Sequence, residues 1–152
     1  MRGSIPLLTL AAAWVYVAAD HGHTPYDELF NSAGAEYGVP PNLLRAVARS
    51  ESGFNPAAIG AAGERGMMQL TRATASSVGL DWARALEPRE NVRAAARYFV
   101  TLRRNLGARW SAWTWVAAYN AGPDLEPAAK ANAYALRVVY HWLGYDAGRV
   151  FA

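Results

Sequence analysis

After residue 23, hydrophobic and polar positions alternate with a helical period along most of the chain, with proline and glycine between the runs. Thr24-Pro25 opens the first expected helix and Gly38 closes it. Pro40-Pro41 opens the second, which ends at Ser52-Gly53. Further helices are expected over 66–78, 88–106, 111–120 and 127–143, the last closed by Gly144. Alternating β-branched runs are nearly absent, so the pattern predicts an all-α domain of six or so helices.

An acidic side chain, Glu51, lies on the apolar face of the second expected helix. It follows Leu44, Val47 and Ala48 at the spacing of one helical face, whereas the basic residues of this helix should lie on the other side (Arg45, Arg49). Partial burial and the negative end of the helix dipole would both raise the pKa of this carboxyl. A carboxyl that stays protonated near neutral pH suits a general acid. The alternative is an exposed, inactive Glu51 at a frayed helix end.

Composition limits the classes of protein that fit this pattern. The 152 residues are 53% hydrophobic and 18% charged, which indicates one globular domain. The chain has no cysteine, so disulfides, thiol catalysis and cysteine-based zinc sites are excluded. A net charge of +3, with arginines spread over several helices, does not favour nucleic-acid binding. Six Trp and eight Tyr would supply either a core or a surface on which sugars or bases stack.

The N-terminal segment has a composition of its own. Residues 5–19 form an uncharged run of fifteen after a single basic residue, with a small-residue finish, and predict a secretory signal peptide. The run is short for a membrane span, which needs about twenty residues. The bulky Trp14 and Tyr16 favour the alternative, an uncleaved anchor. We expect a hydrophobic segment over 1–22, a helical domain over 23–145 and a tail over 146–152.

Four stretches carry a resemblance to a known family: ESGFNP (51–56), GERGMMQLTRATA (63–75), PRENVRAAARYF (88–99) and AAYNAGP (117–123). In this order they resemble the signature segments of the soluble lytic transglycosylases (the SLT family), relatives of goose-type lysozyme. The resemblance runs from about residue 26 to 140. It implies that 23–145 is a lysozyme-like transglycosylase domain with a groove for the glycan strands of peptidoglycan.

The resemblance also implies a reaction and the residue that performs it. Enzymes of this family cleave the β-1,4 bond between N-acetylmuramic acid and N-acetylglucosamine and leave 1,6-anhydromuramic ends. By that match Glu51 is the sole catalytic residue, first an acid and then a base, while the N-acetyl oxygen of the substrate stabilises the anomeric carbon. No cofactor and no metal ion are implied.

The resemblance further implies substrate-binding residues around Glu51: Gln69, Tyr119, Tyr98, Asn120 and Ser52. Gln69 would hydrogen-bond a sugar, and Tyr119 would lie close to Glu51 and help to hold the N-acetyl group or the acid. Asn120 is better suited to fixing backbone at a helix end. The alternatives are a helix-surface glutamine and two core tyrosines whose hydroxyls bond to backbone.

The chain departs from the family pattern beside Glu51. Gly60-Ala61 replaces a common Ser-Pro, so a hydroxyl that often contacts the substrate is missing, and Thr71-Arg72 replaces Met-Pro. Glu64 is a possible second carboxylate that would activate water and make the enzyme a lysozyme-type hydrolase. We expect it instead on an exposed loop.

Several biological roles fit such a domain. They are wall remodelling, local opening of the wall for a secretion or conjugation machine, and entry of a bacteriophage particle. The corresponding locations are the periplasm or cell envelope and, alternatively, the virion. A catalytically silent wall-binding module and a nucleic-acid-binding protein are the competing hypotheses from other classes.

Overall fold

The computed structural model describes residues 23–107, 112–122 and 133–150, and within these ranges the chain is helical with no strand. The hydrophobic segment expected over 1–22 lies outside them. The elements are α2 (Asp27–Tyr37), α3 (Pro41–Ser52), α4 (Arg72–Ser77), a 3-10 turn η1 (Trp82–Arg84), α5 (Pro88–Leu106), α6 (Ala112–Ala121) and α7 (Ala133–Val150). Among the described residues, no helix is both long and apolar enough to cross a membrane.

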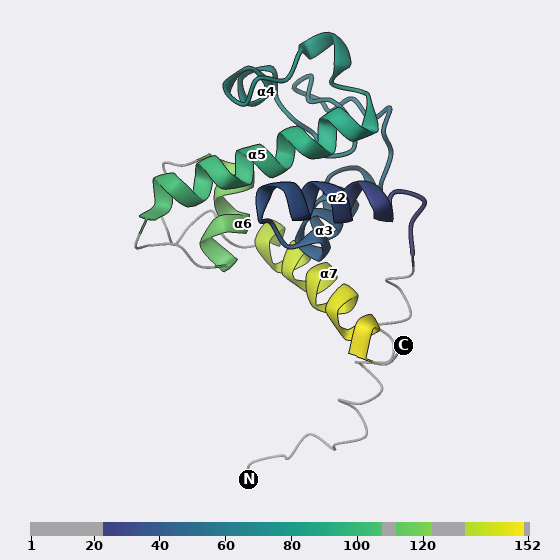
Figure 1. Cartoon of the computed structure of the whole chain (residues 1–152). Coiled ribbons are helices and arrows are strands. Elements are labelled where there is room, and N and C mark those ends of the chain that lie inside the picture. Colours follow the sequence, from purple (N-terminus) through teal and green to yellow (C-terminus); the bar gives the residue numbers. More distant parts are fainter. Residues whose placement is uncertain (1–22, 108–111, 123–132, 151–152) are drawn as a thin grey trace.

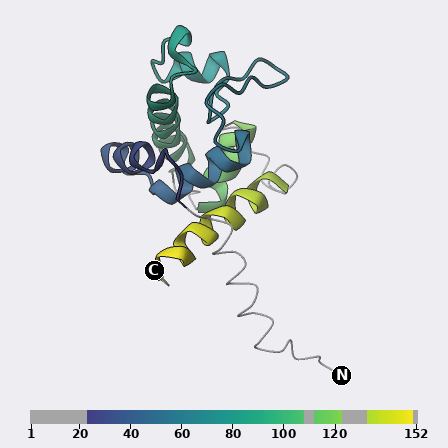
Figure 2. The same cartoon turned by 90° about the vertical axis from the view of Figure 1, so that its right-hand side faces the viewer.

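Helix α3 lies at the centre of the packing. It contacts α2 and α5, and its most extensive contact is with α7, while α5 also packs against α2 and α6. The chain between α3 and α5, which includes α4, lies at one end of the molecule, and α7 extends toward the other end (Figures 1 and 2). The last turn of α3, which carries Glu51, therefore reaches both the loop after it and the helix that packs along it.

The core is formed by the apolar faces of these helices. Its largest fully buried side chains include Phe30, Leu43, Leu44, Phe99 and Trp115. The indole Nε1 of Trp115 donates a 2.7 Å hydrogen bond to the carbonyl of Phe99, and the two rings meet edge to face. Burial of such rings stabilises the domain by roughly 2–3 kcal/mol each, and this contact also fixes α6 against α5.

Two of the expected helices have the expected ends. Helix α3 begins at Pro41 and stops at Gly53, whose φ of 61° suits glycine and ends the helix in a left-handed turn. Helix α5 spans Pro88–Leu106, as predicted. Proline inside the first turn and glycine just past the last one therefore fixed both boundaries. The first helix begins later than expected, at Asp27, because Thr24 and Asp27 form a hydrogen-bonded turn before it.

The helix expected over 66–78 is wrong for its first half. Residues 65–70 form a tight turn in which Arg65 and Leu70 pair as an antiparallel bridge, and only Arg72–Ser77 is helical. Gly66 and Gln69 have φ values of 79° and 47°, which no right-handed helix contains. Thr71 then caps α4, since its side chain accepts a hydrogen bond from Thr74 N.

The last helix extends further than its sequence suggested. Gly144 does not end α7, which continues to Val150, so the expected tail over 146–152 begins inside a helix. The expected start at residue 127 lies outside the described residues. A single glycine costs a helix only about 1 kcal/mol relative to alanine, and packing of the flanking turns against α3 outweighs it.

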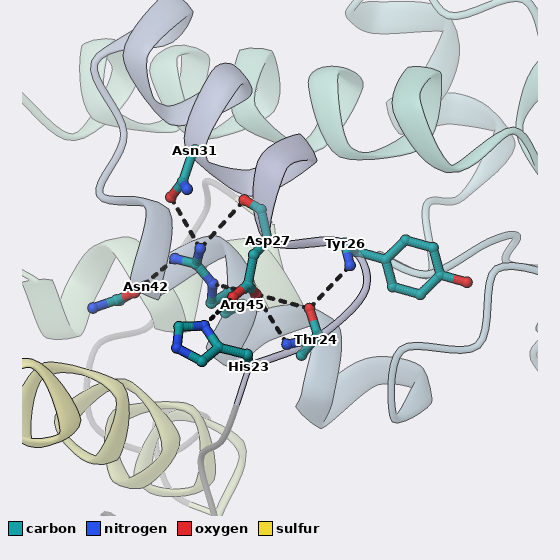
Figure 3. A network of polar contacts seen from close by, with 7 residues as sticks. All are labelled: His23, Thr24, Tyr26, Asp27, Asn31, Asn42 and Arg45. Atoms are coloured by element: carbon teal, nitrogen blue, oxygen red, sulfur yellow. Dashed lines mark hydrogen bonds and ion pairs between the residues drawn. The ribbon is translucent and has the colours of Figure 1, made fainter. Parts of the chain in front are cut away.

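Arg45 was expected on the solvent side of α3, and this was wrong. Its side chain is only 6% exposed and lies among polar groups between α2 and α3 (Figure 3). The guanidinium donates to Asp27 Oδ1 (3.0 Å), Asn42 Oδ1 (2.7 Å) and Asn31 Oδ1 (2.9 Å). These acceptors satisfy a charge that burial would otherwise penalise. The network ties the first helix to the helix that carries Glu51.

Candidate active site

A solvent-open cavity of about 300 Å³ lies beside the last turn of α3. Five of the six residues predicted for the site line it: Glu51, Gln69, Tyr98, Tyr119 and Asn120. They come from α3, the 65–70 turn, α5 and α6, so segments far apart in sequence converge on one hollow. Ser52 is not part of its lining.

Glu51 is half-buried at the edge of this cavity. Burial raises the pKa of its carboxyl from an ordinary 4.5 to about 7, since loss of water disfavours the charged form. A hydrogen bond from Tyr134 and the positive charge of Arg137 act in the opposite direction, and the negative charge of Glu64 adds to the rise. The carboxyl can therefore both give and take a proton near neutral pH.

Tyr134, which the sequence reasoning missed, is the hydrogen-bond partner of Glu51. Its hydroxyl donates to Glu51 Oε1 over 2.8 Å, and its side chain is buried at the start of α7. The guanidinium of Arg137 lies 5.5 Å from the centre of the Tyr134 ring. The signal in the sequence was weak. Tyr134 shares the buried face of α7 with Val138 and Tyr145, but helical periodicity does not reveal a partner 83 residues away.

Tyr119 and Tyr98 form an aromatic wall of the cavity. The ring of Tyr119 stacks on Phe99 at 4.6 Å, and Tyr98 meets it edge to face at 5.7 Å. The hydroxyl of Tyr119 donates to the carbonyl of Met68 over 2.9 Å, so Tyr119 borders the cavity while its proton is held by backbone. Tyr98 is half-buried, and burial raises the pKa of its hydroxyl.

Gln69 lies in the 65–70 turn instead of on a helix surface. Its Nε2 donates to the carbonyls of Gly66 (2.8 Å) and Ala58 (3.3 Å), which fixes which end of the amide is nitrogen. Its Oε1 is therefore the acceptor end of an amide that lines the cavity. Gln69 is the second residue in this turn with positive φ, a backbone strain that the two hydrogen bonds offset.

Asn91, which was not predicted, holds the 65–70 turn against α5. It is fully buried, accepts a 2.7 Å hydrogen bond from Met68 N and donates to the carbonyls of Ala85 (2.9 Å) and Arg65 (3.1 Å). Gly66 leaves the room for this amide, since a Cβ there would lie 2.5 Å from Asn91 Nδ2. A single side chain thus positions the backbone that carries Gln69.

Ser52 and Asn120 lie in different surroundings. Ser52 Oγ donates to the carbonyl of Met67 over 2.8 Å and accepts from Asn55 N, so its contacts join the end of α3 to the 65–70 turn. Asn120 is exposed at the end of α6 and lines the cavity. The structure therefore brings Asn120, but not Ser52, to the place where a ligand would lie.

Glu64 lies closer to Glu51 than expected. It is only partly exposed and lines the same cavity as Glu51, with its Oε2 accepting from Ala62 N over 3.1 Å. Glu64 does lie in a loop whose residues 61–63 are exposed, as expected, but the tight turn over 60–64 folds its side chain back over Gly60. In the part of the chain that the structure describes, no three acidic or histidine residues gather closely enough to hold a metal ion.

Comparison with protein families finds one matching domain. The family model for the transglycosylase SLT domain matches residues 28–138. This span runs from the first turn of α2 into α7, and it includes every residue that lines the cavity.

Two curated relatives are both named as membrane-bound lytic murein transglycosylase F. The protein from Ectopseudomonas mendocina is 33% identical over 134 residues, which are 84% of this chain and 27% of the relative. That from Alkalilimnicola ehrlichii, numbered F 1, is 40% identical over 101 residues, which are 64% of this chain and 20% of the relative. The chain thus spans about a quarter of the length of these proteins.

Two solved structures have a similar fold. The soluble lytic transglycosylase SLT70 from Escherichia coli gives a TM-score of 0.74 at 21% identity, covering 92% of this chain and 26% of that one. An inactive mutant of the lytic transglycosylase Slt from Pseudomonas aeruginosa gives 0.68 at 20% identity, covering 84% and 24%. The all-α architecture is therefore the one these structures share.

Proposed function

The chain belongs to the transglycosylase SLT family, and on that basis we propose that it is a peptidoglycan lytic transglycosylase. It cleaves the β-1,4 bond between N-acetylmuramic acid and N-acetylglucosamine in a glycan strand bound along the cavity. The products are an N-acetylglucosamine end and a 1,6-anhydromuramic end. No cofactor takes part, and the reaction needs one protein carboxyl.

In the first step Glu51 is the general acid. Its carboxyl is protonated below a pKa of about 7, and the proton passes to the bridging oxygen as the bond to the anomeric carbon breaks. The N-acetyl oxygen of the muramic sugar stabilises the resulting positive charge at that carbon.

In the second step the same residue is the general base. The Glu51 carboxylate takes the proton of the sugar's own C6 hydroxyl, and the C6 oxygen bonds to the anomeric carbon to close the anhydro ring. Glu51 is then protonated again and ready for another cycle. The Tyr134 hydroxyl donates to Glu51 Oε1, so it stabilises the carboxylate between the two steps.

One observation carries this proposal: a single carboxyl with a pKa near 7 lies at the edge of a sugar-sized cavity. A group that must be acid and then base within one turnover works best when its two protonation states are close in free energy. The partly buried end of α3 supplies that balance.

The test is to digest purified peptidoglycan and to measure the masses of the soluble fragments by mass spectrometry. Fragments one water lighter than those with reducing ends support the transglycosylase. Glu51→Gln should lower the rate of release by at least about a thousandfold, while Glu28→Gln, a change of equal charge on the exposed surface of α2, should not. A wild-type chain that binds peptidoglycan and releases nothing would instead be a wall-binding module.

A second candidate function, a lysozyme-type hydrolase, has one observation in its favour. Glu64 lines the same cavity as Glu51, and a second carboxylate is what activation of water requires. The same mass measurement separates the two, since hydrolysis gives reducing ends. In that case Glu64→Gln should abolish their formation.

We also propose a location at the cell envelope. The support is that two relatives are named as membrane-bound and that the substrate proposed here lies in the wall. A role in wall remodelling, in a secretion or conjugation machine or in a virion is a narrower proposal. Copurification of the full chain with its native assembly would test it.

A further inference from the structure

Gly60 leaves room for two acceptor oxygens in the lining of the cavity, those of Glu64 and Gln69. A Cβ placed on Gly60 would collide with Glu64 Oε2 and would lie 2.7 Å from Gln69 Oε1. Both oxygens therefore lie where the Cβ of any residue other than glycine would be at position 60. The carboxylate can lie over residue 60 only because that residue is glycine.

No described donor bonds to Gln69 Oε1, and this distinguishes the two ends of its amide. The Nε2 group is already occupied by the carbonyls of Gly66 and Ala58. Glu64 Oε2 has one backbone donor, Ala62 N, at 3.1 Å. Both acceptors lie within 2.7 Å of one point, the position of a Cβ on Gly60, so one donor group of a ligand can bond to both.

The charge of the lining has one sign. Its ionisable acidic side chains are Glu51 and Glu64, and among the described residues no lysine, arginine or histidine lines the cavity, although the whole chain has a net charge of +3. The positive charge that acts on Glu51 is that of Arg137, on α7. A neutral hydroxyl would satisfy one acceptor, but an ammonium group offers three donors and the matching charge.

We propose that Glu64 Oε2 and Gln69 Oε1, gathered over Gly60, bind a protonated amine of the glycan. Such an amine is present at C2 of an amino sugar that has lost its acetyl group. The inference rests on the proposed function, because it assumes a glycan in the cavity. It makes Glu64 a specificity-determining residue, and it gives Gly60 a role, since a side chain there would displace the carboxylate.

Binding measurements test this without turnover. The full chain carrying Glu51→Gln is titrated by calorimetry with a glucosamine tetramer and with an N-acetylglucosamine tetramer, at a pH where the amines are protonated. The ratio compared is the affinity for the glucosamine tetramer divided by the affinity for the N-acetylglucosamine tetramer. We expect this ratio to fall by about tenfold when Glu64→Gln is added, since a charge-assisted hydrogen bond becomes a neutral one. Gly60→Ser should lower the ratio as well.

The matched control is Glu28→Gln, which removes one carboxylate from the exposed surface of α2. If it lowers the ratio as much as Glu64→Gln does, general attraction between a polyamine and the protein explains the result and the proposal is overturned. An unchanged ratio in Glu64→Gln overturns it too. Glu64→Gln keeps the shape of the side chain, so its affinity ratio tests the amine site even where Gly60→Ser fails to fold.

Digestion separates this inference from the proposed function. Native peptidoglycan and peptidoglycan with partly de-N-acetylated glucosamine are offered to the unsubstituted chain and to Glu64→Gln. Release from both substrates with the same preference in both proteins contradicts the amine site and leaves the transglycosylase intact. No release from either substrate, with a tetramer ratio that still depends on Glu64, contradicts the transglycosylase and supports the amine site.

Discussion

The hydroxyl of Tyr134 donates a 2.8 Å hydrogen bond to Glu51 Oε1 and so joins the start of α7 to the end of α3. These two helices have the most extensive contact among the helices described, so packing fixes the bond. A donated hydrogen bond favours the charged carboxylate, whereas burial favours the neutral acid. The protonation of Glu51 is therefore a balance between two opposing effects.

Replacing Tyr134 by phenylalanine should shift that balance. Tyr134→Phe keeps the ring and removes the donor, so the pKa of Glu51 should rise and the alkaline limb of the kcat/KM profile should move up by about one pH unit. The profile is measured from the release of soluble fragments across the acid-to-alkaline range. A limb that stays at the same pH would show that the Tyr134 hydroxyl does not act on the Glu51 carboxyl.

The charges facing Glu51 give two variants that should move the limb in opposite directions. Arg137→Met removes a positive charge and should shift the alkaline limb to higher pH. Glu64→Gln removes a negative charge and should shift it to lower pH. Both shifts should shrink at high salt, because exposed charges are screened. Shifts in the same direction for both variants would contradict the electrostatic origin.

Glu51→Gln should make the protein more stable above neutral pH. The carboxyl has a pKa of about 7 in the folded chain and 4.5 otherwise, so the unfolded chain releases this proton at lower pH. Stability is therefore lost as pH rises from about 4.5 to 7, by up to about 3 kcal/mol. Urea unfolding at about pH 4 and about pH 8 should show equal stabilities for the two proteins in acid and a more stable variant in alkali.

Asn91→Ala should destabilise the domain by about 3 kcal/mol. It leaves Met68 N and the carbonyls of Arg65 and Ala85 without their partner inside the fold. The matched control is Asn105→Ala, an exposed position on the same helix, which should change stability by less than about 0.5 kcal/mol. Thermal unfolding of both variants is the measurement, and equal losses would contradict the role given to Asn91.

Asp27→Asn should weaken the fold near neutral pH but not in strong acid. Burial alone would raise the pKa of Asp27, but hydrogen bonds from His23, Arg45 and Thr24 and the charge of Arg45 outweigh it and hold the value at about 2. The stability that this carboxylate contributes is present above its ordinary pKa of 3.8 and is lost as pH falls through 2. The variant should lose about 1 kcal/mol at neutral pH, given partial screening by solvent, and urea unfolding in neutral and strongly acidic buffer is the measurement.

Proline and glycine predicted the bounds of α3 and α5 well, because both residues act locally. Helix α5 and both ends of α3 follow from residues within one turn of each boundary. The same logic failed at Gly144 and over 65–70. Whether a glycine ends a helix depends on the neighbouring helix, as at Gly144. Whether the methionine-containing run forms a helix or a tight turn depends on a buried amide, that of Asn91, 23 residues away from Met68.

The site was predicted in part for the same reason. The spacing on α3 placed Glu51 on the face with Leu44 and Val47, and both apolar residues are fully buried. Arg45 shows the limit of that reasoning, because a polar pattern does not reveal that Asp27 and Asn31 lie opposite it on the adjacent helix. Tyr134 and the fold of Glu64 over Gly60 depend on long-range packing and on a tight turn, which periodicity does not encode.

The hydroxyl that holds Glu51 comes from a helix synthesised long after the one that carries the acid. A chain still emerging from the ribosome has the acid before it has Tyr134 or the surface of α7 that packs on α3. Its carboxyl then lacks the hydrogen bond from Tyr134 and the packing of α7 on α3. The surroundings that set the pKa of Glu51 are thus complete only when the eighteen-residue α7 docks on α3.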